Sequence, residues 1–343
     1  MMPDNHDYTG AVKEAASRIR ATIPENLVRK FTTICGIKNA DFISCSPAPC
    51  GEVCAVDGSN VMLLESGSMA LAVVRAAQTT FVDMERSRRS VTPMTFALIG
   101  PEEENQDFPI IYADCFGQPP GKTLANEDIS RAAGILRDTL EYWVTETMAN
   151  DLSPGAILLR DGPLRVSHES HNPVLTRIAL ACRDKEVGLA GISKRSAATW
   201  GGGHPLLPAV FGFAKTHAIQ APWWMKIDPA ILDHAAFPQW QHGEMYVACL
   251  HPRSKGPLKI ELTRGIGRDS AAEIMNRLAG CSADGRIPGY PYPLFDAHRI
   301  VALTEEIVEQ VKGDLLGRLA EAGIDRQTYD ILFGDYHDEF ARY

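Results

Sequence analysis

Runs of apolar residues divide the middle of the chain into strands and helices. Three successive apolar segments, at 52–57, 69–82 and 95–99, predict strands because they are short and are bounded by turn-forming or charged residues. Apolar residues at helical spacing then predict a long helix that starts at 126–128 and runs to about residue 148. A strand at 155–160, a helix from Asn172 onward and a strand at 187–192 follow.

This order of elements is the chain path of the ribonuclease H-like fold, in which three strands precede helix, strand, helix and strand. We therefore predict an α/β protein with a ribonuclease H-like mixed sheet flanked by helices. A helical pattern over 9–33 predicts an N-terminal helical extension. Predicted strands at 244–250 and 257–262 and a helix at 270–279 form a β-containing insertion.

The first and fourth predicted strands each end in an aspartate followed by glycine, Asp57-Gly58 and Asp161-Gly162. A single Asp-Gly dipeptide favours an ordinary turn. In the predicted fold, however, these two strands supply paired aspartates. Repulsion between adjacent carboxylates is relieved by a divalent cation, so the pair indicates a metal-dependent phosphoryl-transfer site.

The long predicted helix offers a third acid for this site. Asp138 lies opposite the apolar stripe and is predicted to face solvent. Glu141 and Glu146 lie on opposite flanks of the stripe, and the periodicity does not choose between them. A surface charge is the alternative role for either glutamate.

A proline-rich phrase over 289–298 predicts an extended segment that leads into a helix over 297–311. His298 would then lie in the first turn of that helix. An imidazole there is a candidate metal ligand or proton-transfer group, and packing against the helix end is the alternative.

Composition and charge narrow the class of function. Hydrophobic residues make up 45% of the 343 residues and charged residues 22%, as in ordinary globular proteins. The net charge of −9 argues against a protein that coats nucleic acid, although a local basic lining remains compatible with a nuclease. Candidates for that lining, each alternatively a surface charge, are Arg160, Arg165, Lys194, Arg195, Arg264 and Arg268.

No apolar run is long enough to cross a bilayer, and the N-terminus resembles no secretory signal. We therefore predict a cytoplasmic protein without membrane contact, whose eight cysteines are reduced. Four cysteines lie close together and could hold zinc or an iron–sulfur centre, although burial as small hydrophobic residues is favoured: Cys35, Cys45, Cys50 and Cys54. Core packing is likewise favoured over base stacking for Trp223 and Trp224.

Taken together, four phrases resemble the NurA family of prokaryotic nucleases. They occur in order and cover most of the chain: Val56-Asp57-Gly58-Ser59, Leu159-Arg160-Asp161-Gly162-Pro163-Leu164, Gly191-Ile192-Ser193-Lys194, and Gly289-Tyr290-Pro291-Tyr292-Pro293-Leu294 with Ala297-His298. The resemblance implies an N-terminal extension (1–50), a nuclease domain (51–320, with the insertion at about 200–285) and a C-terminal tail (321–343).

The resemblance also implies an activity and partners. It implies a Mn²⁺-dependent deoxyribonuclease that digests DNA from 5′ ends, with Mg²⁺ as the alternative ion. A single-strand endonuclease activity is an additional activity that the resemblance allows. Family members form ring-like homodimers and work with the hexameric HerA translocase in DNA end resection for recombinational repair. Two alternatives stay open: a non-catalytic clamp that couples a translocase to DNA, and an enzyme that acts on RNA or hybrid duplex.

Site residues follow from the same resemblance. Asp57 and Asp161 match the strand aspartates, Glu141 the helical acid and His298 a C-terminal ligand, so these four are expected to bind the metal. Lys194 and Tyr290 match the residues expected beside the scissile phosphate. DNA contacts are expected from Arg160, Arg165, Lys194 and Arg195.

Overall fold

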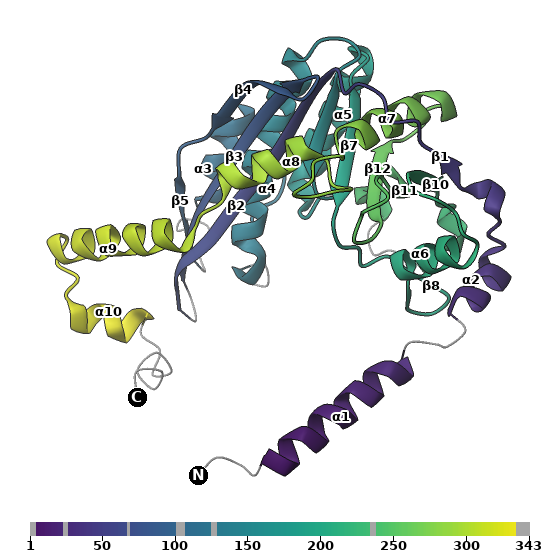
Figure 1. Cartoon of the computed structure of the whole chain (residues 1–343). Coiled ribbons are helices and arrows are strands. Elements are labelled where there is room, and N and C mark those ends of the chain that lie inside the picture. The colour runs from purple at the N-terminus through teal and green to yellow at the C-terminus, as the bar shows by residue number, and fades with distance from the viewer. Residues whose placement is uncertain are drawn as a thin grey trace.

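A computed structural model describes residues 5–22, 27–66, 69–100, 107–124, 129–233 and 238–333. Within these ranges, ten strands form one mixed sheet in the order β1-β10-β11-β12-β7-β6-β2-β3-β4, with β5 paired to β3. Helices cover both faces of this sheet (Figure 1). No helix among the described residues has the length and apolar character that a membrane span requires.

One end of the sheet is an antiparallel meander that two parallel strands extend toward the centre. The meander consists of β2 (Glu52–Glu65), β3 (Ala70–Val82), β4 (Glu85–Val91) and β5 (Thr95–Ile99). On its other side, β6 (Ile157–Asp161) runs parallel to β2, and β7 (Gly188–Ser193) runs parallel to β6. These directions and this order are those of the ribonuclease H-like sheet, so the predicted fold class is confirmed.

The strands of the predicted insertion continue the same sheet beyond β7. They are β10 (Trp223–Lys226), β11 (Gly243–Cys249) and β12 (Leu258–Thr263), with β1 (Ile43–Ser44) at the edge. Because β12 pairs antiparallel with β7, the insertion lies against the central strands. A separate hairpin is formed by β8 (Thr199–Trp200) and β9 (His204–Pro205). The predicted domain boundaries stay predictions.

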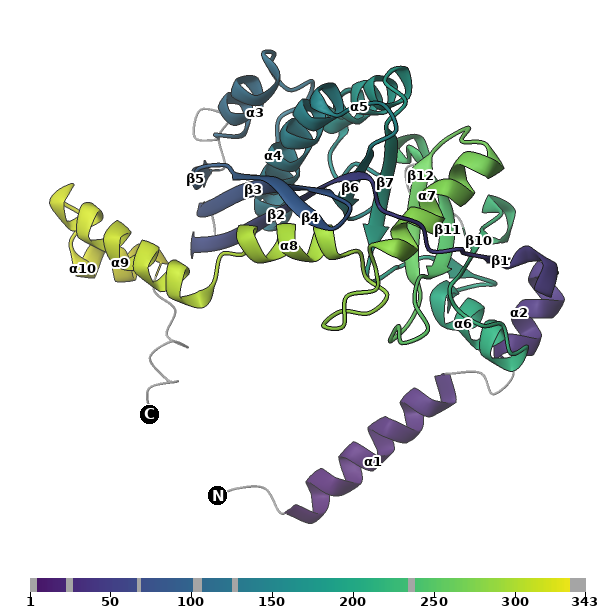
Figure 2. The same ribbon diagram turned by 45° about the horizontal axis from the view of Figure 1, so that its top comes forward.

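Two groups of helices sandwich the central strands. One face is covered by α3 (Phe108–Phe116), α4 (Ile129–Asp151) and α5 (Asn172–Asp184), and the other by α7 (Arg268–Gly280) and α8 (Tyr292–Val301) (Figure 2). Alternate residues of β2 enter the two cores, since successive side chains of a strand point to opposite faces. Cys54 and Val56 pack with α4, whereas Val53 and Ala55 pack with α7 and α8.

The remaining helices lie at the periphery. Both α2 (Leu27–Cys35) and α6 (Leu206–Thr216) pack in the core that includes β10 and β11. At the other end, α9 (Glu305–Glu321) and α10 (Arg326–Phe333) share an apolar cluster with β2 and β3. Residues 8–20 of α1 (Asn5–Thr22) are all exposed. Short 3₁₀ turns occur at Asn39–Asp41, Glu169–His171, Pro229–Ile231 and Pro238–Trp240.

Several predicted boundaries are wrong. The first strand does not stop at Asp57 but continues to Glu65, because it pairs with β3 over its whole length. Sequence patterns missed β4, since all seven of its residues are exposed and four are charged. Sequence patterns also missed the helix α3. The predicted start of the long helix, at 126–128, lies outside the described residues.

The helical predictions for the two ends of the chain also need correction. The pattern over 9–33 corresponds to α1 and α2, with 23–26 outside the described residues. The C-terminal helix begins at Tyr292 rather than 297, because Pro293 fits the first turn, where no backbone donor is required. His298 therefore lies in the last turn of α8.

The tryptophan prediction is confirmed, because Trp223 and Trp224 are 1% and 2% exposed. Cys45 and Cys50 lie in the core beneath α7, whereas Cys54 lies in the core beneath α4. Burial raises the pKa of Cys45 and of Cys54 to about 12, so both thiols stay protonated. Across the described residues, no cysteine belongs to a group of ligands placed to bind a metal.

One buried histidine gives the fold a predictable response to acid. Burial lowers the pKa of His171 from 6.5 to about 3, and its Nε2 lies 2.8 Å from the Thr139 hydroxyl. Between these pKa values the unfolded chain binds a proton that the folded state does not, so stability falls as the pH falls. Acidification from about pH 7.5 to about pH 5 should lower the free energy of unfolding by about 2 kcal/mol through this residue.

Urea unfolding of wild type and His171→Phe at both pH values measures this contribution. Phenylalanine cannot take up a proton, so the variant should lose less stability on acidification than wild type, whatever its stability at neutral pH. Equal losses in the two proteins would show that the folded state protonates His171 readily.

Candidate metal centre

Parallel pairing of β2 with β6 places two aspartates side by side. The register aligns Val56 with Arg160, so the next residues, Asp57 and Asp161, are neighbours across the two strands. His298 reaches the same point from α8. One ligand atom from each of Asp57, Asp161 and His298 lies within 4.8 Å of the other two, the only such group among the described residues.

This donor set fits a small divalent cation. Carboxylate oxygens with one imidazole nitrogen suit Mn²⁺ or Mg²⁺, and the imidazole favours Mn²⁺. Ligands on opposite sides of such an ion lie about 4.2 Å apart, a separation that fits within the 4.8 Å limit of this group. Asp57 is buried, whereas the side chains of Asp161 and His298 are 16% and 54% exposed, so the group is open to solvent on one side.

Neighbouring groups compensate the charge of both carboxylates. His298 Nδ1 lies 2.8 Å from Asp57 Oδ2, and this hydrogen bond raises the pKa of His298 against the opposing effect of burial. Lys194 Nζ lies 2.7 Å from Asp161 Oδ2, and the Tyr290 hydroxyl donates to the same oxygen at 3.2 Å. Burial, with the nearby charges of Asp161 and Asp57, raises the pKa of Tyr290, so the phenol stays protonated.

Two arginines of the meander hold α8, and with it His298, against the sheet. Arg86 of β4 forms a two-contact ion pair with the buried Asp296 of α8, at 2.8 and 2.9 Å. Arg75 of β3 donates to the backbone carbonyls of Val301 and Ala302, at 2.7 and 2.5 Å. These carbonyls end the helix, where a cation is also favoured by the helix dipole.

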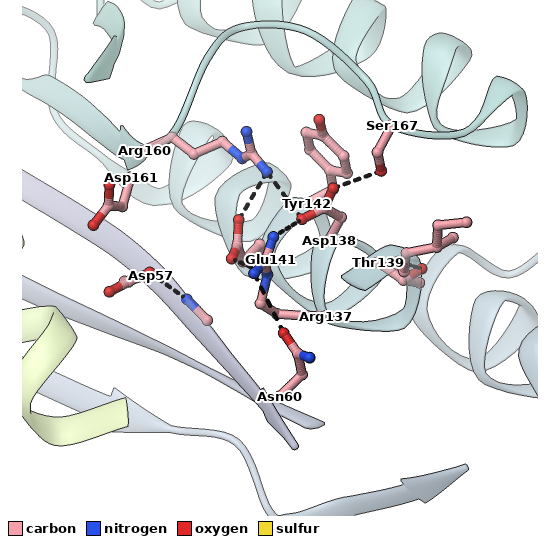
Figure 3. Close-up of polar contacts among 12 residues, drawn as sticks. Asp57, Asn60, Arg137, Asp138, Thr139, Glu141, Tyr142, Arg160, Asp161 and Ser167 are labelled. Atoms are coloured by element: carbon pink, nitrogen blue, oxygen red, sulfur yellow. Dashed lines mark hydrogen bonds and ion pairs between the residues drawn. The ribbon is translucent and has the colours of Figure 1, made fainter. Parts of the chain in front are cut away.

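On the opposite face of β2, α4 contributes a buried network of acids and arginines. Figure 3 shows Arg160 reaching from β6 to Glu141 and Asp138, away from Asp57 and Asp161. Arg160 Nη2 lies 2.8 Å from Glu141 Oε2 and 3.4 Å from Asp138 Oδ1. Arg137 contacts the same two acids at 3.1 and 2.8 Å. Each of the two acids therefore contacts both arginines inside the protein.

The predicted orientation of Asp138 is wrong. Asp138 is only 5% exposed, and the Ser167 hydroxyl donates to its Oδ2 at 2.6 Å. Burial raises the pKa of Asp138, but the combined effect of Arg160, Arg137 and Ser167 is larger and opposite, so the net shift of the pKa is downward. Asp138 is thus an internal counter-ion of the two arginines.

Glu141, rather than Glu146, borders the metal centre. Glu141 is 2% exposed and lies over Gly58, directly after Asp57. Both of its carboxylate oxygens are engaged by arginines, and it is not part of the three-residue ligand group. Burial raises the pKa of Glu141 more than Arg160 lowers it. Glu146 instead pairs with Arg177 at 2.7 Å.

The predicted basic lining separates into two environments. Lys194, which contacts Asp161, is exposed, as are Arg195, Arg264 and Arg268. Arg160 is 3% exposed, donates to the Pro163 carbonyl at 2.8 Å and lies over the Tyr142 ring at 4.6 Å. It therefore supports the acids of α4 from inside and does not lie on the surface with the others. Arg165 is half-buried.

The glycines of the two Asp-Gly phrases serve different purposes. Gly162 has a φ of 118°, so the second phrase ends its strand in a conformation that favours glycine. Gly58 lies inside β2, where a Cβ would come within 2.6 Å of Glu141 Oε1 and 2.7 Å of Arg137 Cγ. The first glycine therefore makes room for the network of α4.

Sequence patterns missed the residues that hold the site together. Arg75 and Arg86 lie on strands of the meander, far along the chain from α8, and no local pattern links them to it. A weak signal existed for Arg160, because a cation inside an otherwise apolar strand requires a buried acid as partner.

Comparisons with known proteins agree with this architecture. Residues 51–199 match the family model described as the NurA domain. The chain is similar to the crystal structure of the NurA nuclease from Sulfolobus solfataricus, with a TM-score of 0.58 and 14% identity over 94% of this chain and 98% of that chain. A NurA structure bound to dAMP and manganese has a TM-score of 0.58 and 11% identity, covering 92% and 98%.

A further NurA crystal structure matches with a TM-score of 0.56 and 10% identity, covering 89% of this chain and 98% of that chain. Identities this low show a shared fold. No curated protein matches the chain.

The close approach at Gly58 predicts the effect of a single methyl group. Gly58→Ala should displace Glu141 and Arg137 and lower the free energy of unfolding by about 1–3 kcal/mol, because the added atom overpacks a filled interior. The matched control is Gly134→Ala in α4, where a Cβ would meet nothing within 4 Å. This control should stabilise the helix by up to about 1 kcal/mol.

Urea unfolding at neutral pH compares the two variants. A Gly58→Ala protein as stable as wild type would contradict the packing of Glu141 over β2.

Proposed function

We propose that this chain is a metal-dependent deoxyribonuclease, because residues 51–199 match the family model of the NurA domain. The observation that carries the proposal is the convergence of Asp57, Asp161 and His298 on one point at the end of β6. We further propose that Mn²⁺ is the preferred ion, with Mg²⁺ as a substitute, and that digestion proceeds from 5′ ends. The solved NurA structure with dAMP and manganese supports both the ion and a nucleotide substrate.

The chain supplies both the cation ligands and the groups that receive the phosphate. Asp57, Asp161 and His298 would hold the ion, which when bound lowers the pKa of an attacking water and stabilises the leaving oxygen. His298 must give up its proton to act as a ligand, since its hydrogen bond to Asp57 favours the protonated ring.

Lys194 and Tyr290 would act on the scissile phosphate. The ammonium of Lys194 lies at the exposed side of Asp161, where its charge can offset the charge that accumulates on the phosphoryl oxygens. The protonated Tyr290 hydroxyl can donate a hydrogen bond to a phosphate oxygen or to a water. Both groups are held in place before substrate binds, since each already contacts Asp161.

Glu141 has a different position from the other expected ligands. It lies behind β2 at Gly58, in the arginine network, so we assign it the role of holding Arg160 and Arg137 in place behind Asp57. Direct ligation by Glu141 would require its release from Arg160 and Arg137. This assignment supports a centre in which Asp57 and Asp161 carry most of the ligand charge.

The proposed partners follow from the resemblance to the NurA family. We propose that the enzyme works as a homodimer with a HerA-type hexameric translocase in the cytoplasm, in DNA end resection for recombinational repair. Support for a further protein interface comes from α1, where Tyr8, Val12 and Ile19 are 69%, 49% and 63% exposed.

Cleavage of labelled linear DNA tests the proposed activity. Wild type with Mn²⁺ should degrade a 5′-labelled duplex, and Asp57→Ala and Asp161→Asn should each reduce the rate by at least about 10³-fold, since each removes a ligand of an ion that contributes several kcal/mol to the transition state. Chelation of the metal should abolish cleavage by wild type. Asp184→Asn, a change at an exposed carboxylate on α5, is the matched control and should cleave like wild type.

Retention of full activity in Asp57→Ala would contradict the assignment. DNA binding by wild type without any cleavage would instead favour the clamp that couples a translocase to DNA. Parallel reactions with RNA and with a hybrid duplex identify the substrate, because the proposal requires DNA to be cleaved fastest.

A further inference from the structure

The turn between β11 and β12 lies at the same end of the sheet as the candidate metal centre. In the register of β7 with β12, Lys259 pairs with Ser193, the residue before Lys194. In the register of β6 with β7, Asp161 pairs with Ile192. Residues 251–257, which precede Lys259, therefore extend beyond the strand ends at which Asp161 and Lys194 lie.

A direct contact joins this turn to the segment that carries Tyr290. Gly289 has a φ of 90°, and a Cβ at this position would come within 2.7 Å of the Ser254 Cβ. Ser254 therefore lies against the backbone next to Tyr290, whose hydroxyl contacts Asp161. The turn is therefore linked to Asp161 through Gly289 and the side chain of Tyr290.

Two cations flank this contact. Arg253 and Lys255 are both exposed, and within the described part of the chain neither side chain makes an ion pair or a hydrogen bond. By contrast, the nearby Lys194 is paired with Asp161 and Arg286 is paired with Asp284. The two unpaired cations thus form a local positive site on a chain whose net charge is −9.

The turn is fixed by its own hydrogen bonds. The His251 ring accepts the backbone N–H of Arg253 through Nδ1 at 3.0 Å. The Ser254 N–H donates to the His251 carbonyl at 3.0 Å, and the Cys249 thiol donates to the same oxygen at 3.8 Å. A turn that is ordered before binding loses little entropy when a ligand engages its side chains.

We propose that residues 251–257 form a DNA-backbone contact, in which Arg253 and Lys255 bind phosphates of the strand that enters the metal centre. The proposal rests on the proposed nuclease function and extends it by naming residues that hold the substrate. Arg253 and Lys255 touch neither Asp57, Asp161 nor His298, so they act on substrate binding and leave the cleavage step unchanged.

The salt dependence of DNA binding tests this contact. Fluorescence anisotropy of a labelled single-stranded oligonucleotide, with Ca²⁺ in place of Mn²⁺, gives the Kd from about 50 to about 200 mM KCl. Each phosphate contact contributes about 0.7 to the slope of log K against log salt concentration for single strands. Arg253→Gln combined with Lys255→Gln should therefore weaken binding at low salt and reduce the slope by about 1.4.

Two further variants complete the experiment. Arg253→Lys combined with Lys255→Arg keeps both charges and should retain the wild-type slope. Arg183→Gln combined with Lys185→Gln removes two exposed cations near the other end of β7 and should also retain the slope. In the Mn²⁺-dependent reaction, the Arg253→Gln/Lys255→Gln protein should show a raised KM with kcat close to the wild-type value, which also demonstrates that its centre is intact.

The possible results separate the contact from the activity on which it rests. A wild-type slope in the Arg253→Gln/Lys255→Gln protein, with wild type binding and cleaving DNA, would overturn the contact and leave the nuclease function standing. An equal loss of slope in the Arg183→Gln/Lys185→Gln protein would overturn the contact as well, because the effect would then reflect overall charge. Absence of both DNA binding and cleavage in wild type would overturn the proposed function together with this contact.

Discussion

Charge repulsion between Asp57 and Asp161 is the constraint on which the rest of the site depends. Parallel pairing of β2 and β6 forces the two carboxylates together at one end of the sheet. Compensating groups come from two other segments of the chain, since His298 on α8 contacts Asp57 and Lys194 after β7 contacts Asp161. A divalent ion would relieve the repulsion between the two carboxylates more strongly, since its two positive charges act on both carboxylates at once.

The two faces of the sheet carry different parts of the candidate site. Strand alternation directs Asp161 toward α8 and the adjacent Arg160 toward α4. On the α8 side lie Asp57, Asp161 and His298, where Asp161 and His298 are partly exposed to solvent. The α4 face is closed, and there Arg160 and Arg137 contact Glu141 and Asp138 behind Gly58. Removal of one member of such a buried set leaves an uncompensated charge, which is strongly destabilising.

The sequence predicts those features that local patterns encode. The order of strands and helices and the two Asp-Gly phrases were sufficient to predict the sheet and the meeting of Asp57 with Asp161. The burial of Asp138 was not predictable from helical periodicity, because its partner Arg160 comes from a strand elsewhere in the chain. The exposed strand β4 has no apolar alternation, so neither the strand nor the ion pair of Arg86 with α8 could be foreseen.

The most direct test of the account is the position of a bound ion. Crystals of the protein grown with Mn²⁺ and measured near the manganese absorption edge would show the ion as an anomalous peak. The account predicts a peak about 2.0–2.2 Å from oxygens of Asp57 and Asp161 and from a ring nitrogen of His298. A peak bound by Glu141 and Asp138 instead, or its absence at saturating Mn²⁺, would contradict the account.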